Sequence, residues 1–294
     1  MRKFFIIIWS IITAPFRFIR WIFQSIGRLL NWLVRKIKAF FTEEEEDTPL
    51  TEAMAKTVAN PMSVMVHINA LRKHLFRALI VMALTTAFSF SYSRQILELL
   101  ANPLSGGITG LVAIDVTEPM GTLMKVSLLT GFALALPYIV FEVYLFIAPG
   151  VSPKSRLLGC LSIPVVVSFF LGGMAFAYYV LLPAAIPFLT SVMGITTQVR
   201  PSSYVSFTTG LLFWIGIAFE FPLVIFLLAS MGIIKARALL NQWRLAIVII
   251  AIMAALITPT IDPVNMSLVM GPMIFLYFLS IGLAFLAQRK RTEA

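Results

Sequence analysis

Two carboxylates stand inside long apolar runs of this sequence, and their position makes them the residues most able to do chemistry. Glu142 lies in a run that ends at Pro149-Gly150, and Glu220 lies in Phe219-Glu-Phe-Pro222. A charge in hydrocarbon is costly, so each acid needs a partner, a water-filled recess or a task. Glu142 shares a helix face with Phe146, four residues later. For Glu220, pairing with Lys125 or with a helix terminus is the structural alternative to a functional role.

The other reactive residue types form no catalytic or metal-binding pattern. Cys160 is the single cysteine, which excludes an intramolecular disulfide and a cysteine-rich metal site. His67 and His74 flank the basic segment His67-Ile-Asn-Ala-Leu-Arg-Lys-His74 and are interpreted as interfacial residues. No nucleophile stands beside a base, and no set of metal ligands is present. The sequence therefore predicts a non-enzymatic protein with no cofactor and no metal.

The composition is that of an integral membrane protein. Hydrophobic residues make up 60% of the chain and charged residues 12%, with a mean hydropathy of +0.94. A soluble domain is about half apolar and about a quarter charged. The net charge of +10 would suggest a nucleic-acid partner in a soluble protein. Here the basic residues lie mostly between apolar runs, where membrane topology and anionic lipid account for them, so no nucleic-acid partner is predicted.

Residues 1–42 are predicted to form a separate helix that lies on the membrane surface. Its polar stripe covers roughly 80° at ~100° per residue, and the other faces are apolar. This pattern predicts binding to anionic lipid. A signal peptide is the alternative, but no convincing small-residue cleavage site follows the apolar run. Residues 43–62, which begin with the acidic run Glu43–Asp47, are predicted to be a solvated linker.

The remaining domain, residues 63–294, alternates apolar spans with polar connections and predicts an all-α membrane fold. The predicted spans are 74–92, 120–148, 157–182, 205–230, 243–258 and 267–287. The second is long enough to tilt or to project from the bilayer, and the fifth is short enough to thin it locally. One set of connections carries most of the Lys and Arg residues, so the positive-inside rule places both ends of the domain in the cytoplasm. No internal repeat is evident, which counts against an inverted-repeat transporter.

Short motifs stand at the ends of the predicted spans, spread over most of residues 64–288. The motifs are Leu71-Arg72-Lys73, Asn102-Pro103-Leu104, Asp115-Val-Thr-Glu-Pro119, Phe146-Ile-Ala-Pro-Gly150, Gly173-Met-Ala-Phe-Ala-Tyr178, Tyr204-Val-Ser-Phe207, Phe219-Glu-Phe-Pro222, Met231-Gly-Ile233, Ile257-Thr-Pro259 and Asp262-Pro263. In their order and spacing the chain resembles the TatC family, the multi-span receptor subunit of the twin-arginine protein translocase.

The resemblance implies six transmembrane helices in a cupped, concave body in the plasma membrane of a prokaryote. It implies a receptor for twin-arginine signal peptides that assembles with single-span TatA/TatB-type subunits and works as a homo-oligomer within a complex. Folded proteins are then moved across the membrane by the proton-motive force.

The resemblance also assigns roles to residues of this chain. The signal-binding rim on the cytoplasmic side would be Leu71, Arg72, Lys73, Phe146 and Pro149, and we add Glu142, which stands where an amide is common in the family. Contacts with partner subunits inside the membrane would involve Glu220, Tyr178 and Pro222, and the outer loops would use Pro103, Asp115 and Asp262. A diarginine motif requires carboxylates at the rim because guanidinium pairs with them bidentately.

This chain departs from the family pattern at that rim. The glutamate expected before the Leu-Arg pair is Ala70, and the glutamate expected in the first cytoplasmic loop is Ser155. Three explanations stay open. Glu142 supplies a replacement carboxylate, the chain is a divergent paralogue with another partner, or it works beside a second family copy that keeps both acids.

Two further alternatives remain at the level of the whole chain. The N-terminal module is either a plain membrane anchor or a fused TatA-like element, which would raise the effective concentration of that partner. A small-solute channel or secondary transporter is the rival function, although it would need polar residues near mid-bilayer on several facing helices.

Overall fold

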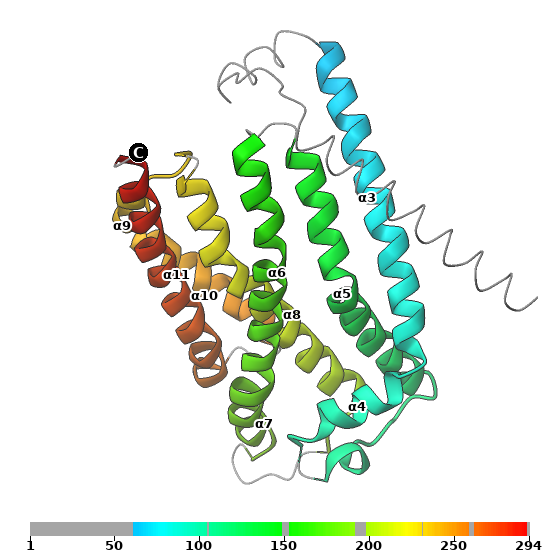
Figure 1. The fold of residues 1–294 in the computed structure, drawn as a ribbon. Helices are drawn as coiled ribbons and strands as arrows, with labels where there is room; N and C mark the ends of the chain where they lie inside the picture. Colours follow the sequence, from blue (N-terminus) through cyan, green and yellow to red (C-terminus); the bar gives the residue numbers. More distant parts are fainter. Residues whose placement is uncertain are drawn as a thin grey trace, which may run out of the picture. The chain divides into compact units, whose positions relative to one another are not determined.

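The described part of the chain is helical. The computed structural model describes residues 61–104, 106–148, 153–191, 198–230, 232–258 and 262–292, and in these ranges no strand forms (Figure 1). This agrees with the predicted all-α membrane fold. The predicted surface helix 1–42 and nearly all of the linker lie outside the described residues. Most of the described chain belongs to one compact unit, residues 65–146 and 161–294.

Five described helical segments are long and apolar enough to cross a membrane: residues 67–90, 118–147, 159–190, 201–230 and 263–288. The helices are α3 (Pro61–Phe90), α4 (Ser93–Ala101), α5 (Glu118–Ile147), α6 (Pro153–Phe176), α7 (Leu182–Ser191), α8 (Pro201–Ser230), α9 (Ala236–Asn241), α10 (Trp243–Ile257) and α11 (Pro263–Thr292). A short 3-10 helix, η1 (Gly107–Gly110), follows α4, and a π turn, η3 (Ala177–Leu181), joins α6 to α7.

The predicted fifth span is present as a helix but is short. α10 has 15 residues, which is about 22 Å at ~1.5 Å per residue. The hydrocarbon layer of a bilayer is about 30 Å thick. The count of six spans therefore stays a prediction.

Two helices extend beyond the predicted spans, because hydropathy marks the part of a helix inside the membrane and not where the helix stops. α3 begins at Pro61, before the predicted span 74–92, and includes the basic segment His67–His74. The third span continues beyond 182 through η3 and α7 to Ser191. The prolines predicted inside spans, Pro137, Pro164 and Pro222, do lie within α5, α6 and α8. Neighbouring groups in a membrane bundle can satisfy the carbonyls that proline frees.

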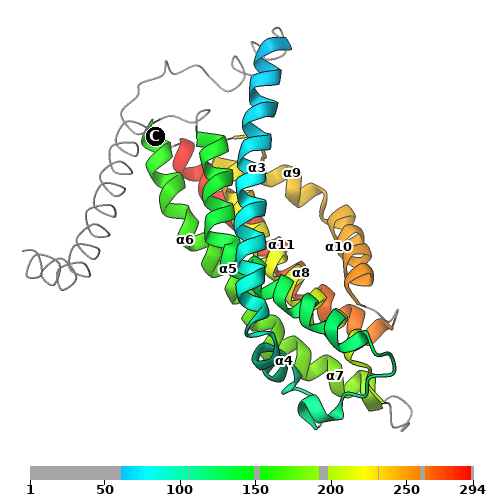
Figure 2. The ribbon, with the colours of Figure 1, turned by 90° about the vertical axis from the view of Figure 1, so that its right-hand side faces the viewer.

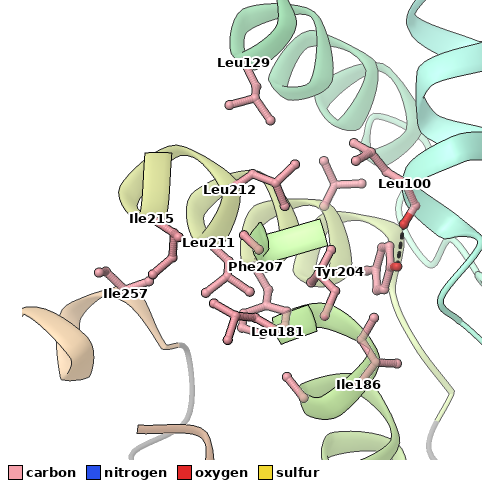
Figure 3. Packing of buried hydrophobic residues seen from close by; sticks show 14 of the residues in the cluster. Leu100, Leu129, Leu181, Ile186, Tyr204, Phe207, Leu211, Leu212, Ile215 and Ile257 are labelled. Carbon is pink, nitrogen blue, oxygen red and sulfur yellow. Dashed lines mark hydrogen bonds between the residues drawn. The ribbon is translucent and has the colours of Figure 1, made fainter. Parts of the chain in front are cut away.

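The largest core is built around α8. Its buried side chains, among them Leu211 and Ile215, pack with residues from α4, α5, η3, α7, α10 and α11 (Figure 3). Tyr204 of α8 donates its hydroxyl to the carbonyl of Leu100 in α4 at 2.7 Å, and both residues are buried. α11 packs along α8 over much of its length (Figure 1). α8 therefore lies at the centre of this core, in contact with helices from several parts of the chain.

α3 is attached to this body through α5, beside which it runs in both views (Figure 1, Figure 2). Only 6% of its span is buried, compared with 28% to 39% in the other four. Thr85 donates its hydroxyl to the carbonyl of Gly131 at 2.8 Å, and Ser89 hydrogen-bonds Thr130. A Cβ on Gly131 would lie 2.5 Å from the Cα of Thr86, so the absent side chain lets the backbones approach. We call this contact zone the α3–α5 seam.

Candidate functional site

Glu142 is buried at the end of α5 that meets the basic first turns of α3. Its Oε2 accepts a hydrogen bond from His74 Nδ1 at 2.5 Å, and Arg77 Nη1 lies 4.0 Å from the same oxygen. Its Oε1 accepts a hydrogen bond from the Tyr138 hydroxyl at 2.5 Å. We call these four residues the Glu142 cluster. Its geometry meets the requirement that a carboxylate inside an apolar run must have partners.

Helix periodicity explains why α3 presents these donors to α5. His67, Ala70, His74 and Arg77 recur at spacings of three and four residues, which places them near one side of the helix. Both histidines contact Phe146 on α5, with ring centroids 4.4 Å away for His67 and 6.2 Å for His74. His74, which the sequence predicts to be an interfacial residue, also binds the carboxylate of Glu142 through its ring.

The remaining rim residues predicted on α3 point elsewhere. Leu71 is exposed, and Arg72 and Lys73 line a recess with Asn69 and Phe76. Among the described residues, the ion-pair partners of Glu142 are His74 and Arg77, not Arg72 or Lys73. Glu142 and Phe146 thus both contact α3 through His74, whereas Arg72 and Lys73 line the recess. Pro149 lies outside the described residues.

Glu220 lies in α8 with one oxygen unpartnered. Its Oε1 is buried and has no hydrogen-bond partner within the described ranges. The structural alternative for Glu220, a pairing with Lys125, is absent from the described ranges. Lys125 instead donates a hydrogen bond to Ser206 at 2.6 Å. Pro222 is buried in the same helix. Tyr178, in the π turn, donates its hydroxyl to the carbonyl of Leu99 at 2.7 Å.

A second charged cluster, at the opposite end of α5, was not predicted from the sequence. Glu118, the first residue of α5, accepts hydrogen bonds from the backbone N–H and the hydroxyl of Ser202 at 2.9 and 2.5 Å. Arg200 Nε lies 3.4 Å from the same carboxylate, and the N–H of Ile114 donates to it at 3.1 Å. The one local feature of the sequence that could have indicated this cluster is Glu118 before Pro119 at the start of a helix, where the helix dipole favours negative charge.

The predicted outer-loop residues stabilise local backbone. Asp262 caps α11, since its carboxylate accepts the backbone N–H of Asn265 at 2.8 Å and its side-chain amide at 3.0 Å. Asp115 accepts the N–H of Thr117 at 3.2 Å. Pro103 is half-buried after α4. In the described ranges, no group of three or more His, Cys, Asp or Glu residues could hold a metal ion.

Comparison with known proteins identifies the family. The family model described as Sec-independent protein translocase protein (TatC) matches residues 66–272. The chain belongs to the TatC family. A TatC from Koribacter versatilis is 32% identical over 262 residues, covering 84% of this chain and 96% of that protein. A TatC from Deinococcus radiodurans is 34% identical over 247 residues, covering 81% of this chain and 91% of that protein.

A solved structure agrees with the TatC assignment. A crystal structure described as the twin-arginine translocase receptor TatC superposes with a TM-score of 0.69 at 30% identity, covering 75% of this chain and 99% of that one. Membership of the TatC family makes the chain a translocase subunit, not an enzyme. Together with its candidate spans, membership makes it a multi-pass membrane protein.

Proposed function

We propose that this chain is the receptor subunit that binds twin-arginine signal peptides and passes folded proteins to the translocation machinery. The proton-motive force would drive transport across the plasma membrane of a prokaryote, with both termini in the cytoplasm. The proposal is supported by similarity to a structure described as the twin-arginine translocase receptor, nearly all of which is covered.

The signal would bind where the basic end of α3 meets the end of α5. The main support for this location is Glu142, whose buried carboxylate is hydrogen-bonded to His74, one helical turn after Ala70 on α3. It provides the acid that a guanidinium needs, in place of the glutamate replaced by Ala70. Phe146, which contacts His67 and His74, offers apolar surface at the same contact between α3 and α5, and Leu71 is exposed. Arg72, Lys73 and Pro149 complete the proposed rim.

Partner subunits would contact the chain inside the membrane near Glu220. A buried carboxylate oxygen without a partner is costly, and a polar side chain from a single-span TatA/TatB-type helix would satisfy it. Pro222 and Tyr178 belong to the same proposed surface, and a second copy of the chain belongs to the proposed complex.

The N-terminal module would hold the chain to anionic lipid through the basic stripe of residues 1–42. Deleting residues 1–55 distinguishes an anchor from a TatA-like fusion. A fusion predicts that transport is lost and then rescued by a separate TatA-type protein. Unchanged transport would exclude the fusion.

Site-specific photocrosslinking to a twin-arginine precursor tests the receptor function. Probes at Ala70, Phe146 and Ser155 are compared with the same precursor carrying two lysines in place of the arginines. We expect crosslinks that weaken with the lysine signal. Crosslinks indifferent to the lysines would support a divergent paralogue with another partner, and no crosslinks at any probe would reject signal binding.

A further inference from the structure

Donors from this chain already occupy the carboxylate of Glu142. His74 and Arg77 lie on the same helix, three residues apart, and both approach Oε2, while Tyr138 holds Oε1. The exposed fraction of the side chain increases from Glu142 to His74 to Arg77. The side chain of Glu142 is 4% exposed, that of His74 is 20% exposed and that of Arg77 is 46% exposed.

We propose that His74 and Arg77 form an internal cap on Glu142, and that the arginines of a signal peptide bind by displacing this cap. This inference rests on the proposed receptor function and adds a regulation of the same site. In the resting protein, the two cap residues take the places that the two guanidinium groups of a signal would take. Tyr138 stays bound to the other oxygen throughout.

A direct exchange of hydrogen-bond donors explains how a buried carboxylate can bind a signal peptide. Leaving a buried carboxylate unpaired is strongly unfavourable. If an arginine replaces His74 as His74 leaves, the carboxylate remains hydrogen-bonded at each stage. Both cap residues are more exposed than Glu142, so an incoming side chain meets Arg77 and His74 before it meets the carboxylate.

The geometry of the cap favours arginine as its competitor. Arg77 is 4.0 Å from Oε2, which is beyond hydrogen-bond distance, so Oε2 has its hydrogen bond from the single nitrogen of His74. A guanidinium can give two parallel N–H donors to a carboxylate, whereas an ammonium acts as a point charge. A lysine signal would therefore gain less from displacing the cap. The cap lowers the affinity for every signal, and only the diarginine motif recovers the loss.

The test measures binding of twin-arginine and twin-lysine signal peptides to the purified full chain in nanodiscs. The variant His74→Ala removes the cap, and Glu142→Gln removes its target. His67→Ala is the matched control, because His67 is on the same helix and contacts the same Phe146 ring, whereas the histidine bound to Glu142 is His74. Arg77→Gln serves as the second cap variant in case His74→Ala does not fold, and thermal unfolding of each variant checks folding.

We expect His74→Ala to tighten arginine-signal binding by on the order of tenfold, since one charge-assisted hydrogen bond no longer has to be broken. The ratio of arginine to lysine affinity should fall in Glu142→Gln and stay unchanged in His67→Ala. In the Glu142→Gln background, His74→Ala should have no further effect, because two residues that act through one contact are not additive.

Two results would overturn the cap. One is weaker arginine-signal binding in both His74→Ala and Arg77→Gln. The other is an arginine-to-lysine ratio in Glu142→Gln that equals that of the unaltered chain. In either case the receptor function would stand, because the unaltered chain still discriminates the two signals. If the unaltered chain binds neither signal, the receptor function fails and the cap fails with it.

Discussion

Single buried hydrogen bonds join helices of the core, and Tyr204 is the clearest example. Its hydroxyl is the donor to Leu100 in α4 at 2.7 Å, and the side chain is buried. Tyr204→Phe should lower the free energy of unfolding by about 1 kcal/mol, because the Leu100 carbonyl loses a donor from the side chain. Denaturant titration in detergent measures this. Tyr179→Phe is the control, since Tyr179 is 73% exposed, and an equal loss there would contradict the prediction.

Glu118 connects the starts of α5 and α8 at the end opposite the Glu142 cluster. Because its carboxylate accepts from Ser202 and Ile114 and pairs with Arg200, Glu118→Gln should lower the unfolding temperature. Arg200 is expected to stabilise the fold by pairing with the charge of Glu118. Once Glu118→Gln has removed that charge, Arg200→Gln should change the unfolding temperature little further. Asp115→Asn is the control, because the described hydrogen bond of the Asp115 side chain is a short-range one from the Thr117 N–H. Additive losses would show that the pair does not act as a unit.

The acids of the site could be predicted from the sequence, but most of their partners could not. Glu142 and Glu220 stand out because charges are rare in apolar runs. Tyr138 is one turn before Glu142 on the same face and could be inferred. His74 is 68 residues from Glu142 along the chain, and local spacing gives no information on which helices are neighbours. For the same reason, the sequence suggested Glu220 as a partner for Lys125, whereas the structure pairs Lys125 with Ser206.

Among the helices, the α3–α5 seam has the least room for a side chain. A Cβ on Gly131 would lie 2.4 Å from Thr86 Oγ1 and 2.5 Å from its Cα. Gly131→Ala should therefore force the two helices apart and lower the free energy of unfolding by about 1–3 kcal/mol. Gly121→Ala on the same helix is the control, because its Cβ would meet nothing within 4 Å. Equal unfolding curves for the two variants would show that the seam tolerates the added methyl group.

The helical type of the fold was predictable because apolar runs of this length have few alternatives in a membrane. The α3 start and the end of the third helical segment were not, for two different reasons. α3 carries the basic segment His67–His74 before its apolar run, and hydropathy does not show whether a charged segment continues a helix. The π turn at Ala177–Leu181 continues the third span without a break, and nothing in its sequence, Ala-Tyr-Tyr-Val-Leu, separates it from an α-helix.

At the scale of the whole molecule, we expect α10, the predicted fifth span, to set a preference for bilayer thickness. Its length of about 22 Å is shorter than a hydrocarbon layer of about 30 Å. We expect the unfolding temperature to be higher in short-chain than in long-chain phosphatidylcholine bilayers, because less deformation is needed around α10. Inserting about one helical turn of leucine and alanine into α10 should move the optimum to longer lipids. An optimum that stays the same after insertion would show that α10 does not set the preference.

The small buried fraction of α3 has a consequence for the order of assembly during synthesis. No described residue of α3 belongs to the main core around α8, although α3 is the first described span to be made. A helix satisfies its own backbone hydrogen bonds, so α3 can wait in lipid as a separate helix until α5 is inserted. The α8 core can form without it, because the described contacts of the seam are with α5 and not with that core. The first described span to be made would thus dock on the body through one neighbouring helix, independently of the core that joins the others.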